Sequence, residues 1–284
     1  MRKMNTQFWG PSGWKFLHSI TAIYPEIPNF TEKIMMRDFM QLVCDILPCK
    51  YCRASFTKYS QSLDITPYLE SREMIMEWLY KMHNKVNGKL RRQGFCTKEN
   101  PTLEHVEKIY QKEVEYILDI LEKNNRGKEC MQNVINYLCD LGDDFLGSII
   151  FNYQGYFSNC HTSEEKTKIV ATYHKFFNIL QPMICHYIAK LSTSGKNASD
   201  TYQIKKFKIR HMLLQNEPYS KLKKWFYECD LFCSAETHYK TIQEYENHFN
   251  KHIVSFCNNP KVDTIKSCRN TNMKNNKHTM KRKH

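Results

Sequence analysis

Two cysteines separated by two residues, Cys49 and Cys52, are the side chains of this chain best suited to carry out chemistry. They follow Pro48 and come just before a helical pattern, which predicts that they lie in the first turn of a helix. Unpaired backbone N–H groups and the positive end of the helix dipole stabilise a thiolate there, and the thiolate is the form that attacks disulfides. A pair at this spacing can close a small disulfide loop, so it can alternate between dithiol and disulfide.

The C-x-x-C motif alone leaves several functions open. A haem attachment motif is excluded because Arg53, and not histidine, follows Cys52. A thioredoxin-like protein would have a strand before the motif, whereas a helical stripe precedes it here. A zinc site would need two further ligands, and although His83 is available, no second cysteine pair is close in the sequence.

A second motif places polar side chains beside an apolar helical stripe. His83 and Asn87 are four residues apart and therefore share a helix face, next to Met82. An imidazole and an amide at the inner edge of a bundle can stack on a planar heteroaromatic ligand and form hydrogen bonds with it. Lys89 and Arg92, about one turn further along, could contact a pyrophosphate.

A third motif combines an aromatic ring with a histidine. Trp14 and His18 are four residues apart and follow a turn-rich run that contains Gly10. A single histidine beside an apolar face is usually a core residue, so each motif by itself is weak. The three motifs together, within about 90 residues, point to a planar ligand bound next to a redox-active cysteine pair.

The elements that must position these residues are predicted to be helices. The 284 residues are 41% hydrophobic with only nine Gly and nine Pro, which argues against a disordered, fibrous or turn-rich all-β chain. Thr31 is expected to cap the second helix, and Gly88 to end the fourth. The first two helices expected in the first bundle have apolar stripes over residues 14–21 and 35–46, with Glu32 in the first turn of the second, and the next two cover residues 49–59 and 71–87.

A polar, proline-stopped stretch at 97–101 predicts a domain boundary. We expect an all-α chain with a helical bundle over 1–98, a second helical domain over 101–256, and an unstructured tail over 257–284. The last 34 residues carry nine basic side chains and one acidic one, so nucleic acid is expected to bind only through this tail, if at all. The helices expected in the second domain cover residues 103–123, 130–151, 164–190, 204–214 and 221–232.

A second close pair of cysteines, Cys229 and Cys233, allows three interpretations. The pair can be purely structural, can be a shuttle disulfide, or can bind zinc together with His248 and His252. The zinc interpretation belongs to a rival function, a nucleic-acid-binding or interaction protein in which the C-x-x-C is structural.

The order G-x-x-x-W-x-x-x-H, C-x-x-C and H-N-x-V-N-x-K-L resembles the Erv/ALR family of FAD-linked sulfhydryl oxidases. The resemblance covers roughly residues 5–96. The matching residues are Gly10, Trp14, His18, Cys49, Cys52, His83, Asn84, Val86, Asn87, Lys89 and Leu90.

This resemblance implies a thiol oxidase that holds FAD within the first bundle. Cys52 would lie nearest the flavin, and Cys49 would exchange with dithiols of client proteins. Electrons would pass through FAD to O2 and give H2O2, and the protein would be a homodimer. The residues expected to bind FAD are Gly10, Trp14, His18, His83, Asn84, Val86, Asn87, Lys89 and Arg92.

The chain also departs from cellular members of the family. The positions of their structural disulfide are Gln61 and Tyr80 here, so this brace is missing. Members from large DNA viruses similarly do without such a brace. The long helical extension resembles the mimivirus type, and both features suggest a viral origin. No apolar run is long enough to span a membrane and no secretory signal is visible, so we expect no membrane partner and a location in the cytoplasm and the virion.

Overall fold

The computed structural model describes residues 4–95, 98–123, 128–158, 161–192 and 241–253, which form helices as predicted. Within these ranges the only β feature is an isolated antiparallel bridge between Met4 and Ile253. The elements are α1 (Thr6–Ala22), α2 (Phe30–Ile46), α3 (Lys50–Ser62), a short 3₁₀ helix η1 (Thr66–Glu70), α4 (Arg72–Arg92), α5 (Leu103–Lys123), α6 (Lys128–Leu141), α7 (Asp143–Ser158), α8 (Ser163–Ser192) and α11 (Ile242–Lys251).

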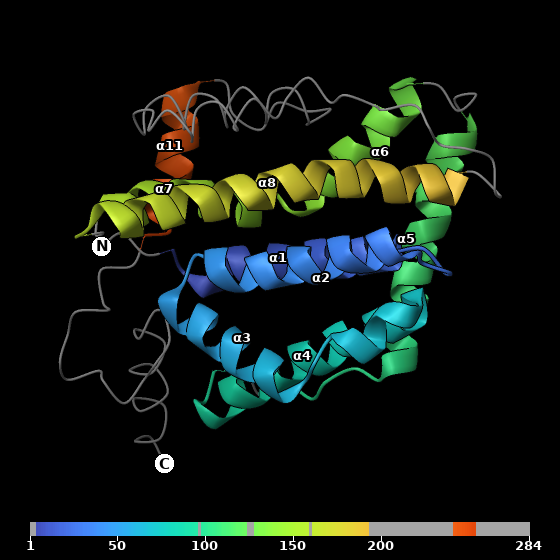
Figure 1. Cartoon of the computed structure of the whole chain (residues 1–284), viewed down its shortest axis with the longest axis horizontal. Coiled ribbons are helices and arrows are strands. Elements are labelled where there is room, and N and C mark those ends of the chain that lie inside the picture. The colour runs from blue at the N-terminus through green and yellow to red at the C-terminus, as the bar shows by residue number, and fades with distance from the viewer. Residues whose placement is uncertain (1–3, 96–97, 124–127, 159–160, 193–240, 254–284) are drawn as a thin grey trace, which may run out of the picture.

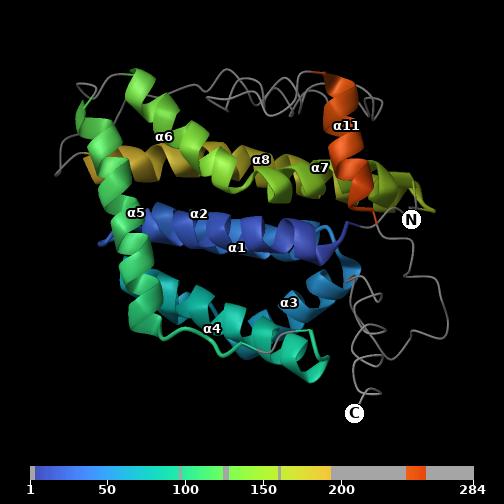
Figure 2. The same ribbon diagram turned by 180° about the vertical axis from the view of Figure 1, so that it is seen from behind.

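The helices are arranged in layers (Figure 1). α1 and α2 form the middle layer, with α3 and α4 on one side and α7 and α8 on the other. α5 runs across one end of these layers, and α11 stands across α7 near the opposite end (Figure 2). Among the described residues, no helix is both long enough and apolar enough to cross a bilayer.

One hydrophobic core connects the helices before and after residue 100. Phe39 of α2 stacks on Phe176 of α8 with 5.7 Å between ring centroids, and Phe16 of α1 packs on Phe145 of α7 at 6.1 Å. All four rings are fully buried. The division of the chain at 98–101 stays a prediction from sequence, but in space the later helices complete the core of the earlier ones.

Two predicted helix ends differ from the structure. Asn29, and not Thr31, caps α2, because its side chain accepts from the Glu32 N–H at 3.0 Å while the Glu32 carboxylate accepts from the Asn29 N–H at 2.6 Å. α4 does not end at Gly88 but continues to Arg92. The basic side chains of its last turn interact favourably with the negative end of the helix dipole. Gly94, with φ of 72°, follows the helix.

The single helix predicted over 130–151 is wrong, because Gly142 separates α6 from α7. A Cβ atom at this position would lie 2.7 Å from Cδ2 of the buried Phe16 ring, so only glycine lets the ring approach the backbone this closely. The helix predicted over 103–123 has the bounds of α5. The helices predicted over 204–214 and 221–232, and the tail over 257–284, lie outside the described residues.

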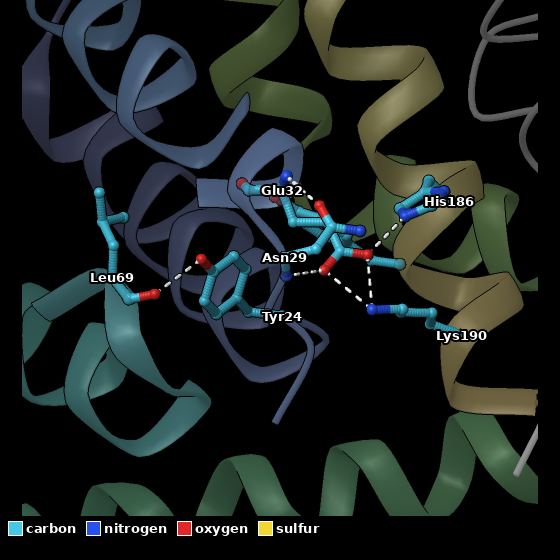
Figure 3. Close-up of polar contacts among 7 residues, drawn as sticks. Tyr24, Asn29, Glu32, Leu69, His186 and Lys190 are labelled. Carbon is cyan, nitrogen blue, oxygen red and sulfur yellow. Dashed lines mark hydrogen bonds and ion pairs between the residues drawn. The ribbon is translucent and has the colours of Figure 1, made fainter. Parts of the chain in front are cut away.

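A buried carboxylate joins α2 to α8 at the end of the molecule near α5. Glu32 is fully buried and accepts from Nε2 of His186 at 2.7 Å and from Nζ of Lys190 at 2.7 Å. Figure 3 shows this carboxylate between the Asn29 backbone on one side and the two α8 side chains on the other. Nearby, Tyr24 donates to the Leu69 carbonyl at 3.0 Å.

Candidate active site

The cysteine pair lies at the start of α3. Cys49 is the N-cap residue, and its Sγ accepts from the Cys52 N–H at 3.3 Å. Its carbonyl accepts from the N–H groups of Cys52 and Arg53, each at 3.0 Å. Negative charge on the Cys49 sulfur would therefore face the positive end of this helix. Cys49 is fully buried, whereas Cys52 is half-buried.

A cavity of about 590 Å³ lies next to Cys52, between α1, α3, α4, α5 and α7. This volume is within the range of pockets that hold small organic ligands. Two of the predicted site residues, Cys49 and Arg92, do not line the cavity. The predicted site residues that line it are Gly10, Trp14, His18, Cys52, His83, Asn84, Val86, Asn87 and Lys89.

Four rings form one wall of the cavity. The Trp14 and His83 rings stack with centroids 3.9 Å apart and planes within 10°. Nε2 of His18 lies 3.3 Å from Nδ1 of His83, and the Tyr110 ring stacks on the His18 ring at 5.0 Å. Because Trp14 and His18 come from α1, His83 from α4 and Tyr110 from α5, three helices fix the position of this wall.

Both histidines of the wall are held neutral. Burial, together with the neighbouring His83, lowers the pKa of His18 to about 3, and burial lowers the pKa of His83 to about 4. At neutral pH one ring therefore donates to the other across their 3.3 Å contact, and neither carries a charge. A pair of neutral imidazoles suits contact with an uncharged aromatic ring system.

Several polar atoms around the cavity lack a hydrogen-bond partner among the described residues. They are Thr6 Oγ1, Trp9 Nε1, His18 Nδ1 and Gln93 Oε1, and all four residues line the cavity. Buried polar groups in native proteins are nearly always partnered. The mixture of donors and acceptors, next to stacked rings, fits a planar heteroaromatic ligand that forms hydrogen bonds at its edge.

Cationic side chains are available for an anionic part of such a ligand. Lys15 and Lys89 both line the cavity, and Nζ of Lys89 donates to Oγ of Ser55 at 2.6 Å. Arg92 is exposed, one turn beyond Gly88, and lies outside the lining. The structure therefore places one of the two predicted phosphate-binding cations in the cavity wall and the other on the adjoining surface.

Residues from later helices also reach the cavity, although they were not among the predicted site residues. Val106, Ile109 and Tyr110 of α5 line it, as does Phe145 of α7. The first three recur at i, i+3 and i+4, which marks an apolar helix face. The predicted boundary at 97–101 assigned that face to another domain, so its contribution to this cavity was not recognised.

The residues of the alternative zinc site do not form a metal centre among the described residues. Cys229 and Cys233 lie outside the described ranges. Nε2 of His248 lies 3.4 Å from Oδ1 of Asp144, and the His252 ring stacks on the Phe8 ring at 3.7 Å. Across the described residues, no group of three or more His, Cys, Asp or Glu side chains is arranged to hold a metal.

Comparison with known proteins identifies relatives of this site. The Erv1 / Alr family profile matches residues 11–111. The mitochondrial FAD-linked sulfhydryl oxidase ERV1 of Saccharomyces cerevisiae is 41% identical over 86 residues, which are 30% of this chain and 44% of the yeast protein. The probable FAD-linked sulfhydryl oxidase R368 of Acanthamoeba polyphaga mimivirus is 32% identical over 85 residues, which are 30% of this chain and 59% of the viral protein.

These matches span about half the length of the two relatives, and no solved structure matches the chain. The FAD-linked sulfhydryl oxidase of African swine fever virus is 30% identical over 82 residues, which are 29% of this chain and 67% of that protein. The matched segment contains the three motifs except for Gly10, which lies one residue before it, and the structure brings residues of each motif to one cavity. The chain therefore belongs to the Erv1 / Alr family.

Proposed function

We propose that this chain is an FAD-dependent thiol oxidase that forms disulfides in protein clients. The observation that carries the proposal is that Cys52, one half of a C-x-x-C pair, lines the same cavity as the stacked Trp14 and His83 rings. Two of the relatives above are named as FAD-linked sulfhydryl oxidases and a third as a probable one, and the stacked rings in the wall of this 590 Å³ cavity support a flavin as the ligand.

The cysteines would perform thiol–disulfide exchange. A client thiolate attacks the Sγ atom of Cys49 in the oxidised pair, which breaks the bond to Cys52 and forms a mixed disulfide. The second client thiolate then attacks the client sulfur of that bond, so the client leaves oxidised and both cysteines are left reduced. Because Cys49 is fully buried, its sulfur would have to become exposed before a client thiolate could attack it.

The other residues would bind and orient the cofactor. Trp14 and His83 would pack against the ring system, and the unpartnered Nδ1 of His18 would take a hydrogen bond at its edge. Lys89, with Arg92 beside it, would face the pyrophosphate. When bound, FAD supplies the two-electron chemistry that links the reduced cysteines to O2, with H2O2 as the product.

A spectrum and one substitution test this function. The purified protein should show the visible absorption of bound flavin, and Cys52→Ser should keep the flavin but lose thiol oxidation by about 100-fold or more. Cys139→Ser is the matched control, because Cys139 is a half-buried cysteine outside the cavity lining, and its activity should stay at the wild-type level. A colourless protein, or normal turnover of Cys52→Ser, would contradict the proposal.

The expected partners follow from the same chemistry. Clients are proteins with paired thiols, and the Cys52→Ser variant should retain them as mixed disulfides on Cys49. We propose a homodimer, and the molar mass from light scattering can test it. Its interface would avoid the faces of α1 and α2 that α7 and α8 cover. The expected location, in the cytoplasm and in virions, is testable by detecting the protein in purified particles.

The rival function, zinc-dependent nucleic-acid binding with a structural C-x-x-C, is not proposed. Its two cysteines and the basic tail lie outside the described residues, and its two histidines contact Asp144 and Phe8. No specific observation favours it over the flavin cavity.

A further inference from the structure

α11 packs against the start of α1, far from it in the sequence. The Asn5 N–H donates to the His252 carbonyl at 2.8 Å, and Met4 forms the antiparallel bridge with Ile253. Phe249 of α11 is fully buried and stacks on Phe151 of α7 at 5.4 Å. Residues 241–253 therefore contact both α7 and the residues just before α1. Figure 2 shows α11 standing across α7 at this end of the molecule.

Two histidines of this segment contact the same phenylalanine. The His252 and Phe8 rings lie 3.7 Å apart with planes within 3°, which is a close parallel stack. The His248 ring lies 5.2 Å from the Phe8 ring, and its Nε2 atom lies 3.4 Å from Oδ1 of Asp144 in the first turn of α7. Phe8 is therefore held from two directions by α11.

Phe8 belongs to the part of α1 that forms one edge of the proposed cofactor cavity. Its neighbours Gln7 and Trp9 line the cavity, and so do Thr6 and Pro11. This part of α1 is a poor helix by its own sequence, because Pro11 lacks an N–H donor and Gly10 and Gly13 flank it. Contacts from outside the helix must therefore contribute to keeping its first turns in place.

We infer that α11 is a clasp that holds the first turns of α1 against the cavity, with His252 as a positioning residue that acts through Phe8. The inference rests on the proposed function, since it names what keeps the cofactor bound. It also assigns the two histidines a role that requires no metal: they fasten one helix to another. The ligand retained by the clasp is the flavin nucleotide.

Flavin release from the full-length protein tests the clasp. His252→Ala removes the ring that stacks on Phe8, so the flavin dissociation rate, followed by the rise of free-flavin fluorescence, should increase by about 2- to 10-fold, the range for one aromatic pair. His252→Phe keeps a ring on Phe8 and should release flavin at a rate within about twofold of wild type. His174→Ala, on α8 and away from the cavity, is the matched control.

Hydrogen exchange gives a readout that does not depend on the cofactor. In His252→Ala the amides of residues 6–10 should exchange faster, while those of α2 and α8 should not change. If the wild type holds flavin and His252→Ala changes neither its release nor the exchange, the clasp is refuted. If the wild type holds no flavin but exchange in residues 6–10 still rises in His252→Ala, the proposed function fails and the mechanical role of α11 stands.

Discussion

Glu32 gives the sharpest test of how the two halves of the chain are joined. The carboxylate is fully buried and accepts from the Asn29 N–H at 2.6 Å, from His186 at 2.7 Å and from Lys190 at 2.7 Å. It thus caps α2 and binds α8 at the same time (Figure 3). Substitution of this single residue should weaken both the start of α2 and the packing of α8.

The size of the effect follows from these contacts. Removal of one partner of a buried ion pair costs about 3–5 kcal/mol, and loss of a reciprocal cap costs about 0.5–2 kcal/mol. The side chains of Lys190 and His186 are 36% and 39% exposed, so they can turn to water and recover part of the loss. We therefore expect Glu32→Ala to lower the free energy of unfolding by about 3 kcal/mol. Glu32→Gln, which keeps one acceptor oxygen, should lower it by about 2 kcal/mol.

Urea unfolding followed by circular dichroism measures these differences. Glu104→Gln is the matched control, because Glu104 pairs with Lys108 at 2.8 Å on the exposed face of α5 and its loss should change the free energy of unfolding by less than about 0.5 kcal/mol. Hydrogen exchange should show faster exchange in α8 for the Glu32 variants alone. A loss in Glu32→Ala no larger than in the control would refute the reasoning.

Three further outcomes follow from the packing and the electrostatics. Gly142→Ala would bring a Cβ atom within 2.7 Å of the buried Phe16 ring, so urea unfolding should show a loss of about 1–3 kcal/mol. Trp14→Ala removes the ring stacked on His83, and a flavin titration should show roughly tenfold weaker binding, largely restored in Trp14→Phe. Burial tends to raise the pKa of Glu32, but hydrogen bonds from Lys190, the Asn29 backbone and His186 outweigh it and lower the pKa. The Glu32 carboxylate therefore contributes fully to the free energy of unfolding above pH 4.5, and this contribution is lost as the pH falls through the folded-state pKa. Between about pH 5 and pH 3, the wild type should lose more of its free energy of unfolding than Glu32→Gln does.

Local sequence patterns predicted the helices well where a helix is amphipathic and its ends carry ordinary signals. α5 has the predicted bounds because its apolar stripe begins and ends with the helix. The break at Gly142 was not predicted, and the close approach of the Phe16 ring that requires glycine there comes from a helix more than 100 residues earlier. The extra turn of α4 after Gly88 has a local explanation instead, since a basic last turn outweighs one glycine.

The candidate site was predictable to the extent that its residues repeat at helical spacing. Trp14 with His18, and His83 with Asn87, are pairs four residues apart, and all four residues line the cavity. The complete burial of Cys49 depends on tertiary packing and has no signature in the sequence. Tyr110 and Phe145 were missed for the same reason, because only the folded chain brings their helices to the cavity.

The layer formed by α7 and α8 has a consequence for anyone who would cut the chain down to the part it shares with its yeast and viral relatives. A fragment that stops at residue 111 would expose the Phe16 and Phe39 rings to solvent, because their partners Phe145 and Phe176 lie beyond that residue in the sequence. Such a fragment should aggregate and be poorly soluble. The stretch inherited in common is thus smaller than the stretch that must be synthesised before the protein can reach its native state.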